Sequence, residues 1–175
     1  MASEHEAAFP RLSQAQIDAL RPWGHVRPIT LGEVLFQEGD RGFSFYVVLE
    51  GAVEIVEQSR GTLHQVTVHE PGEFTGDVDT LTGRSALVTA RATGPGEVLE
   101  LTAGALRQAV DALPEFGEIV LRAFLTRRTL LLSEGFEGIK IIGSRFSADA
   151  HRLRDFATRN AIPFTWIDLE TDEQA

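Results

Sequence analysis

The stretch "GEVLFQEGDRGFSFYVVLEGAVEIV", residues 32–56, contains three short apolar runs that are separated by glycine-bearing turns. Each run is rich in β-branched or aromatic residues, which are typical of strands. The turns contain Glu, Gly and Asp, which favour tight reversals of the chain. The stretch therefore predicts three successive strands. They are expected at Val34–Phe36, Phe45–Leu49 and Val53–Val56, with turns at Glu38–Asp40 and Glu50–Gly51.

The same pattern continues downstream to Leu101. Further short strands are expected at Val66–Val68, Leu87–Ala92 and Val98–Leu101, again with glycine-bearing turns between them. Many short strands at near-regular spacing are typical of a β-barrel or β-sandwich.

Helices are expected on both sides of this β region. Ser13 can cap a short helix that ends at Leu20. Pro114 stands where a longer helix can begin, and Glu115–Glu134 carries an apolar face that is interrupted by Arg127. A second apolar line on this helix either meets a partner helix or is covered by the C-terminal residues. That line consists of Leu121, Leu125 and Leu132.

The C-terminal residues 139–175 predict a separate βαβ unit with parallel strands. Its strands are expected at Ile139–Ile142 and Phe164–Ile167, and Ser147 can cap the helix between them. The inner face of that helix is expected at Leu153, Phe156 and Ala157. Because no closing element follows, we expect the sequence to be a piece of a longer protein.

Composition excludes several classes of function. Sixteen basic against 26 acidic residues give a net charge of −10, which argues against a nucleic-acid surface. The absence of cysteine excludes disulfides and thiolate metal sites. The five histidines show no metal-ligand spacing, so we expect no metal site and place all five on the surface. The polar N-terminus is no secretory signal and no apolar run approaches the roughly 20 residues of a membrane span, so a cytoplasmic location is expected.

Three further stretches combine with residues 32–56 to give a family resemblance. They are "PGEFTGDV" (71–78), "LTGRSALVTA" (81–90) and "PEFGEIVLRAFLTRRTLLL" (114–132). Together they resemble the cyclic nucleotide-binding domain of catabolite-activator-type regulators, cyclic-nucleotide-dependent kinases and channels. The resemblance covers residues 12–134. It implies a mainly β fold with flanking helices, a β-barrel or jelly roll of the cyclic nucleotide-binding type, followed by the βαβ unit at 139–175.

In that family a phosphate cassette holds the ligand, and here it corresponds to residues 76–85. The resemblance implies that glycine lets the backbone approach the ligand, that an acid accepts a hydrogen bond from the ribose 2′-hydroxyl, and that an arginine pairs with the phosphate. The implied ligand is cAMP or cGMP. The residues that would bind its phosphate and ribose are Gly76, Asp77, Val78, Arg84 and Ser85.

The cassette differs from the family pattern in two respects. Asp77 stands where the family usually has glutamate, and the stretch to Arg84 is about two residues shorter than usual. Asp79 adds a carboxylate that would repel a phosphate. Arg84 thus either binds an anion or forms a structural ion pair in a tight turn. On the long helix, the resemblance makes Thr126 and Arg127 candidates for contacts with the base and makes the 115–134 helix the interface of a homodimer.

The C-terminal stretch "IKIIGSRFSADAHRLRDFATRNAIPFTWIDLE" (139–170) resembles the first βαβ of a thioredoxin- or glutaredoxin-like fold. Serines 144 and 147 stand where such folds carry Cys-x-x-Cys, so this segment cannot perform dithiol exchange. The order of the two segments resembles the N-terminal region of some bacterial thioredoxin-reductase-like flavoproteins. FAD- and NADPH-binding domains would follow in the longer protein, and this chain has no dinucleotide fingerprint.

The expected function is that of a regulatory cyclic nucleotide sensor, with no catalytic residue and no cofactor in this chain. One alternative is a barrel that has lost its ligand and acts as a dimerisation or interaction module. Another is a fragment of a transcription regulator, which would require a helix-turn-helix where the βαβ unit stands. We expect neither nucleic acid nor membrane among the partners.

Overall fold

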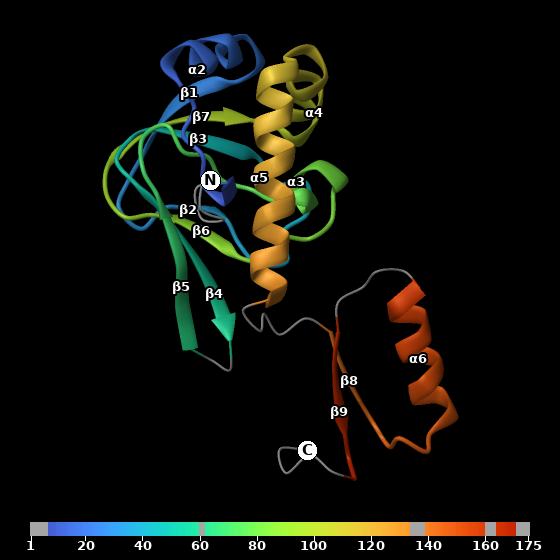
Figure 1. Cartoon of the computed structure of the whole chain (residues 1–175). Coiled ribbons are helices and arrows are strands. Elements are labelled where there is room, and N and C mark those ends of the chain that lie inside the picture. Colours follow the sequence, from blue (N-terminus) through green and yellow to red (C-terminus); the bar gives the residue numbers. More distant parts are fainter. Residues whose placement is uncertain (1–6, 60–61, 134–138, 160–163, 171–175) are drawn as a thin grey trace. The chain divides into compact units, whose positions relative to one another are not determined.

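The computed structural model describes residues 7–59, 62–133, 139–159 and 164–170 (Figure 1). The chain divides into two compact units, residues 1–128 (unit 1) and residues 129–175 (unit 2). Each is described by itself. No helix among the described residues is long and apolar enough to cross a bilayer.

The first helix confirms the N-terminal prediction. Helix α2 spans Gln14–Leu20 and begins with a capping box, in which the Ser13 hydroxyl accepts from the Gln16 backbone N–H and the Gln16 side chain accepts from the Ser13 N–H. Ile17 and Leu20 point into the core. A 3-10 turn, η1 (Arg21–Trp23), leads into the first strand.

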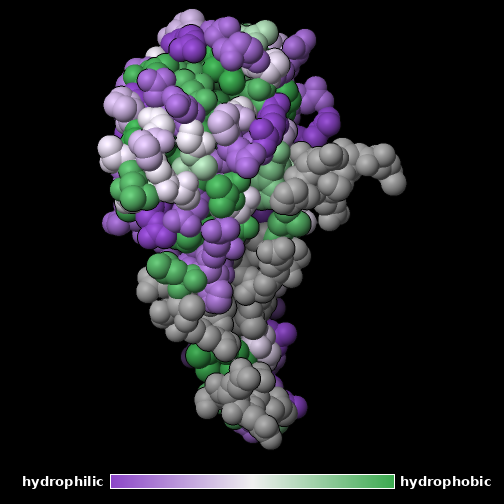
Figure 2. Space-filling model, turned by 90° about the vertical axis from the view of Figure 1, so that its left-hand side faces the viewer, coloured by the Kyte–Doolittle hydropathy of each residue, from purple (hydrophilic) through white to green (hydrophobic). Residues whose placement is uncertain are grey.

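Unit 1 is built on two antiparallel sheets, as the strand pattern predicts. One sheet has the order β1-β7-β3 and the other β2-β6-β4-β5. An apolar core with members from both sheets, such as Ile29, Val48 and Ile55, lies between them. Hydrophilic and hydrophobic side chains intermingle on the outer surface that Figure 2 shows. The strands are β1 (His25–Ile29), β2 (Val34–Phe36), β3 (Phe45–Glu50), β4 (Val53–Ser59), β5 (Thr62–His69), β6 (Thr89–Ala92) and β7 (Gly96–Leu101).

Two features of the sheets lie outside the sequence prediction. Strand β1 has only Ile29 buried, so it lacks the apolar alternation of a strand and is held by its pairing with β7. The β4–β5 hairpin also extends beyond the predicted apolar runs, because Glu57 pairs with His64 and Gln58 with Leu63. These polar extensions depend on backbone pairing and leave no hydrophobic signal.

Three further helices contribute to unit 1: α3 (Val78–Thr82), α4 (Ala103–Ala112) and α5 (Pro114–Ser133), of which residues 114–128 belong to this unit. Helix α5 confirms the predicted long helix, and Figure 1 shows α5 alongside the β-sheets with α3 beside it. Its apolar face packs on Phe45 and Phe74, at ring distances of 6.3 Å from Phe124. The buried α5 residues are Phe116, Val120, Ala123 and Phe124, whereas Leu121 and Leu125 are exposed by 45% and 63%.

Unit 2 confirms the predicted βαβ arrangement. Strands β8 (Ile139–Gly143) and β9 (Phe164–Asp168) pair in parallel, and α6 (Ala148–Arg159) connects them. The Ser147 hydroxyl accepts a hydrogen bond from the Ala150 backbone N–H, so it caps the helix as predicted.

The predicted inner face of α6 is only partly correct. Ala150 and Ala157 are buried, but Leu153 and Phe156 are 57% and 60% exposed. The helix lies so close to the sheet that a Cβ on Gly143 would come within 2.9 Å of the Ala150 Cβ. Small side chains therefore occupy the contact, and the larger apolar ones turn away from it.

Candidate functional site

The start of the cassette requires a glycine. Gly76 has a φ of +99°, which L side chains rarely adopt. A Cβ at this position would also stand 2.8 Å from Thr80 Oγ1 and 3.2 Å from Phe124 Cζ. The backbone at Gly76 is thus packed against both Thr80 of the following helix and Phe124 of α5.

Helix α3 is a single capped turn inside the cassette. The Asp77 carboxylate accepts from the Asp79 N–H at 2.9 Å, and the Asp77 N–H donates to Thr80 Oγ1 at 3.2 Å. Gly83, with a φ of +72°, ends the helix in the left-handed conformation. Burial raises the pKa of Asp77, and the nearby charge of Asp79 raises it further. Val78 is half-buried and packs against the core.

Asp79, the second carboxylate of the cassette, forms an ion pair with Arg128. Asp79 is buried, and its Oδ2 lies 2.8 Å from Nη1 of Arg128 on α5. The sequence interpretation treats Asp79 as a charge that repels a phosphate. The ion pair offsets that charge and ties α5 to α3.

Arg127 lies inside unit 1, next to the start of the cassette. Its Nε donates to the Ala8 carbonyl and its Nη1 to the Gly76 carbonyl, each at 2.7 Å. The guanidinium also stacks over the rings of Phe74, at 4.8 Å, and Phe9, at 5.2 Å. Burial lowers the pKa of Arg127 to about 9, so the group stays charged at neutral pH.

Within the described residues, Nη2 of Arg127 has no hydrogen-bond partner. Thr126, the other candidate for a base contact, is half-buried, and its hydroxyl donates to the Arg122 carbonyl at 2.9 Å. Both side chains therefore make internal contacts, and their role toward a base stays a prediction.

Arg84 and Ser85 stand at the end of the cassette. Arg84 is exposed, and within the described part of the chain it forms no ion pair, so the structure contains no pair between Asp77 and Arg84. Ser85 is half-buried and faces Arg41 across an isolated antiparallel bridge. Sequence analysis does not identify Arg41, because 44 positions separate it from Ser85 and no local pattern connects them.

Residues 26–112 match the family model described as the cyclic nucleotide-binding domain. These residues have the cyclic nucleotide-binding fold. Among solved structures, the catabolite activator protein of Thermus thermophilus superposes with a TM-score of 0.61 at 24% identity, over 74% of this chain and 61% of that chain.

Two curated relatives also match this chain. The chain is 31% identical over 101 residues to the cAMP-dependent protein kinase regulatory subunit of Dictyostelium discoideum, which covers 55% of this chain and 29% of that protein. It is 29% identical over 141 residues to the patatin-like phospholipase domain-containing protein 7 of Mus musculus, covering 79% of this chain and 9% of that protein. The chain thus spans less than a third of either relative.

Unit 1 also contains a buried ionisable pair near the end of β5. His69 is 1% exposed, so its predicted surface position is wrong, because the ring packs 5.8 Å from Phe9. Its Nδ1 lies 3.4 Å from Glu73 Oε2, and Arg11 Nε lies 3.3 Å from the other oxygen of that carboxylate. Burial lowers the pKa of His69 to about 4, although Glu73 acts in the opposite direction. No group of three potential metal-binding side chains occurs among the described residues.

Proposed function

We propose that the chain is a regulatory sensor that binds cAMP or cGMP at the cassette, residues 76–85. The observation that carries the proposal is the state of Arg84, which is exposed and forms no ion pair with any described residue, at the end of a cassette whose start is fixed by Gly76. An exposed guanidinium without a carboxylate partner can donate charge-assisted hydrogen bonds to the oxygens of a phosphate.

The other cassette residues have complementary roles in this proposal. The close packing at Gly76 leaves the backbone N–H of Val78 at the start of the cassette, where the cyclic phosphate would approach, whereas the Asp77 N–H already donates to Thr80 Oγ1. Ser85 would donate its hydroxyl to the same phosphate, and Asp77 would accept from the ribose 2′-hydroxyl. The kinase subunit that resembles this chain is described as cAMP-dependent, which supports the choice of ligand class.

The larger context is also a proposal. We infer that the chain is the N-terminal part of a thioredoxin-reductase-like oxidoreductase, in which FAD and NADPH would bind to domains beyond these residues. The βαβ order of unit 2 supports this assignment, although serines 144 and 147 depart from the Cys-x-x-Cys pattern of such folds. We also propose a homodimer through the 115–134 helix, because Leu121 and Leu125 leave an apolar line exposed on α5.

A second candidate function is an interaction module without a ligand. The capping role of Asp77 favours it, because this buried carboxylate already accepts the Asp79 N–H and is thereby engaged within the protein. The transcription-regulator alternative has less support, since a parallel βαβ unit, and no helix-turn-helix, follows α5 among the described residues.

Calorimetric titration with cAMP and cGMP tests the proposal. We expect the unaltered protein to bind one of them, and Arg84→Ala to abolish binding with the melting temperature nearly unchanged, because an exposed, unpaired side chain is removed. Arg21→Ala is the control for the loss of one exposed positive charge outside the cassette, since Arg21 belongs to η1 and pairs with Asp18 there. A folded, unaltered protein that binds neither nucleotide would favour the module. Intact binding with a large loss of stability in Arg84→Ala would make Arg84 structural.

A further inference from the structure

The arginines of unit 1 differ in how their charge is satisfied. Arg127 is buried against two carbonyls, and Arg107 donates to the Leu81 carbonyl. Among the described residues of this unit, Arg41 and Arg84 are the two arginines whose side chains form neither an ion pair nor a hydrogen bond. Those with a carboxylate partner are Arg11, Arg21, Arg27, Arg91, Arg122 and Arg128.

Arg41 lies opposite the end of the cassette, although 44 positions separate it from Ser85. Arg41 and Ser85 lie directly opposite each other in an antiparallel bridge. The Gly39 N–H donates to the Ala86 carbonyl and the Ala86 N–H to the Asp40 carbonyl, both at 2.8 Å. Residues opposed in this way have Cα atoms roughly 5 Å apart and side chains on the same face. The Arg41 side chain therefore starts beside Ser85, one residue from Arg84.

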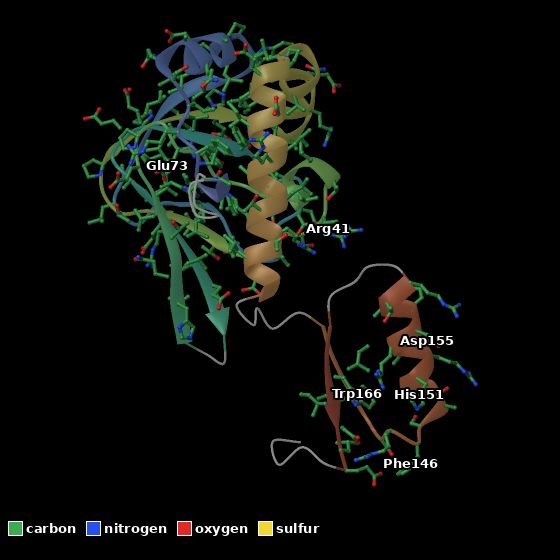
Figure 3. All side chains as sticks on the ribbon, viewed as in Figure 1. Arg41, Glu73, Phe146, His151, Asp155 and Trp166 are labelled. Carbon is green, nitrogen blue, oxygen red and sulfur yellow. The ribbon has the colours of Figure 1, made fainter. Side chains whose placement is uncertain are left out.

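The acidic groups nearest to Arg41 in the chain do not neutralise it. The Asp40 carboxylate accepts from the Gln37 backbone N–H at 2.9 Å and so serves the turn before Arg41. Neither Glu38 nor Asp40 forms an ion pair within the part of the chain that the structure describes. Figure 3 shows Arg41 and Glu73, whose carboxylate pairs with Arg11, at separate places on unit 1.

Arg41 and Arg84 thus both start near the end of the cassette without an ion-pair partner among the described residues, and an anion that contacts both side chains is attracted by both charges. This arrangement occurs in a chain of net charge −10, in which carboxylates are plentiful elsewhere. We propose that Arg41 is a second cation of the cassette and binds the same ligand phosphate as Arg84. The proposal rests on the proposed nucleotide function. It also gives the shortened cassette a second phosphate contact from outside residues 76–85.

The test is a calorimetric titration of each variant with cAMP, with cGMP and, separately, with inorganic pyrophosphate. Arg41→Ala should weaken binding about tenfold at low salt, the usual effect of losing one charge-assisted contact. The difference should shrink at high salt because exposed charges are screened. Arg41→Lys should restore part of the affinity. Arg21→Ala removes the same charge elsewhere and should stay within about twofold of the unaltered protein. The melting temperature of Arg41→Ala should not change, because no partner is lost.

The outcomes separate the two proposals. If Arg84→Ala loses nucleotide binding and Arg41→Ala binds like the unaltered protein, the role of Arg41 is refuted and the nucleotide function stands. If neither nucleotide binds but pyrophosphate does, with losses in both variants, the nucleotide function fails and the two-arginine anion site stands. If no anion binds the unaltered protein, both proposals fail. An equal loss in Arg21→Ala would show a general charge effect and would refute Arg41 as a contact.

Discussion

Replacing Arg127 with methionine tests how the interior of unit 1 is held together. Methionine keeps much of the volume and the contact with the rings of Phe9 and Phe74, but it donates no hydrogen bond. The change therefore removes the donors of two carbonyls that belong to distant parts of the chain. They are those of Ala8, near the N-terminus, and Gly76, at the start of the cassette.

The expected loss follows from how deeply each carbonyl is buried. Ala8 is fully buried, so its carbonyl loses its partner at a cost of about 1–3 kcal/mol. Gly76 is half-buried, and water can replace part of its hydrogen bond, so about 1 kcal/mol is expected there. An opposing effect is that Arg127→Met removes the desolvation penalty of a buried charge, whose Nη2 has no hydrogen-bond partner among the described residues, and this offsets part of the destabilisation. The net destabilisation should be about 2 kcal/mol.

Urea unfolding followed by circular dichroism measures this difference. Arg127→Lys is the matched control, because it keeps the positive charge but replaces the planar guanidinium by an ammonium group. Its free energy of unfolding should lie between those of the unaltered protein and Arg127→Met. Nucleotide affinity should fall as well in Arg127→Met, since the Gly76 carbonyl is no longer held. A methionine variant as stable as the unaltered protein would refute the reasoning, because burial of the guanidinium would then outweigh its hydrogen bonds.

Two further predictions concern pH and assembly. The folded-state pKa of His69, about 4, lies below its unfolded value of 6.5, so its contribution to stability is present above pH 6.5 and is lost as the pH falls toward 4. Between pH 7 and pH 4.5, the free energy of unfolding of the unaltered protein should fall by about 2 kcal/mol more than that of His69→Gln. Equal decreases in the two proteins would contradict a lowered pKa of His69. For assembly, Leu121→Glu combined with Leu125→Glu should convert a dimer to a monomer in sedimentation equilibrium. Glu118→Gln, a change on the same helix, should leave the dimer intact, and an unaltered protein that is already a monomer would exclude this interface.

Local sequence signals determined most of the secondary structure. Ser13 and Ser147 cap their helices as predicted, because capping depends on backbone groups only two or three residues away. The apolar runs of β3 and β4 and the apolar face of α5 lie where periodicity places them. The fold that the family resemblance implied is confirmed, whereas the ligand-binding role of residues 76–85 stays a prediction.

Tertiary structure alone decided which groups meet across the chain. The pairing of Arg41 with Ser85, the contact of Arg127 with Ala8, and the ion pair between Asp79 and Arg128 join positions that lie 44 to 119 residues apart. No local pattern encodes such contacts, since they depend on how the sheets and α5 pack. The burial of His69 and the exposure of Phe156 have the same origin. The hydropathy of a residue indicates only its average tendency to be buried, whereas the packing surface available in the fold decides where its side chain lies.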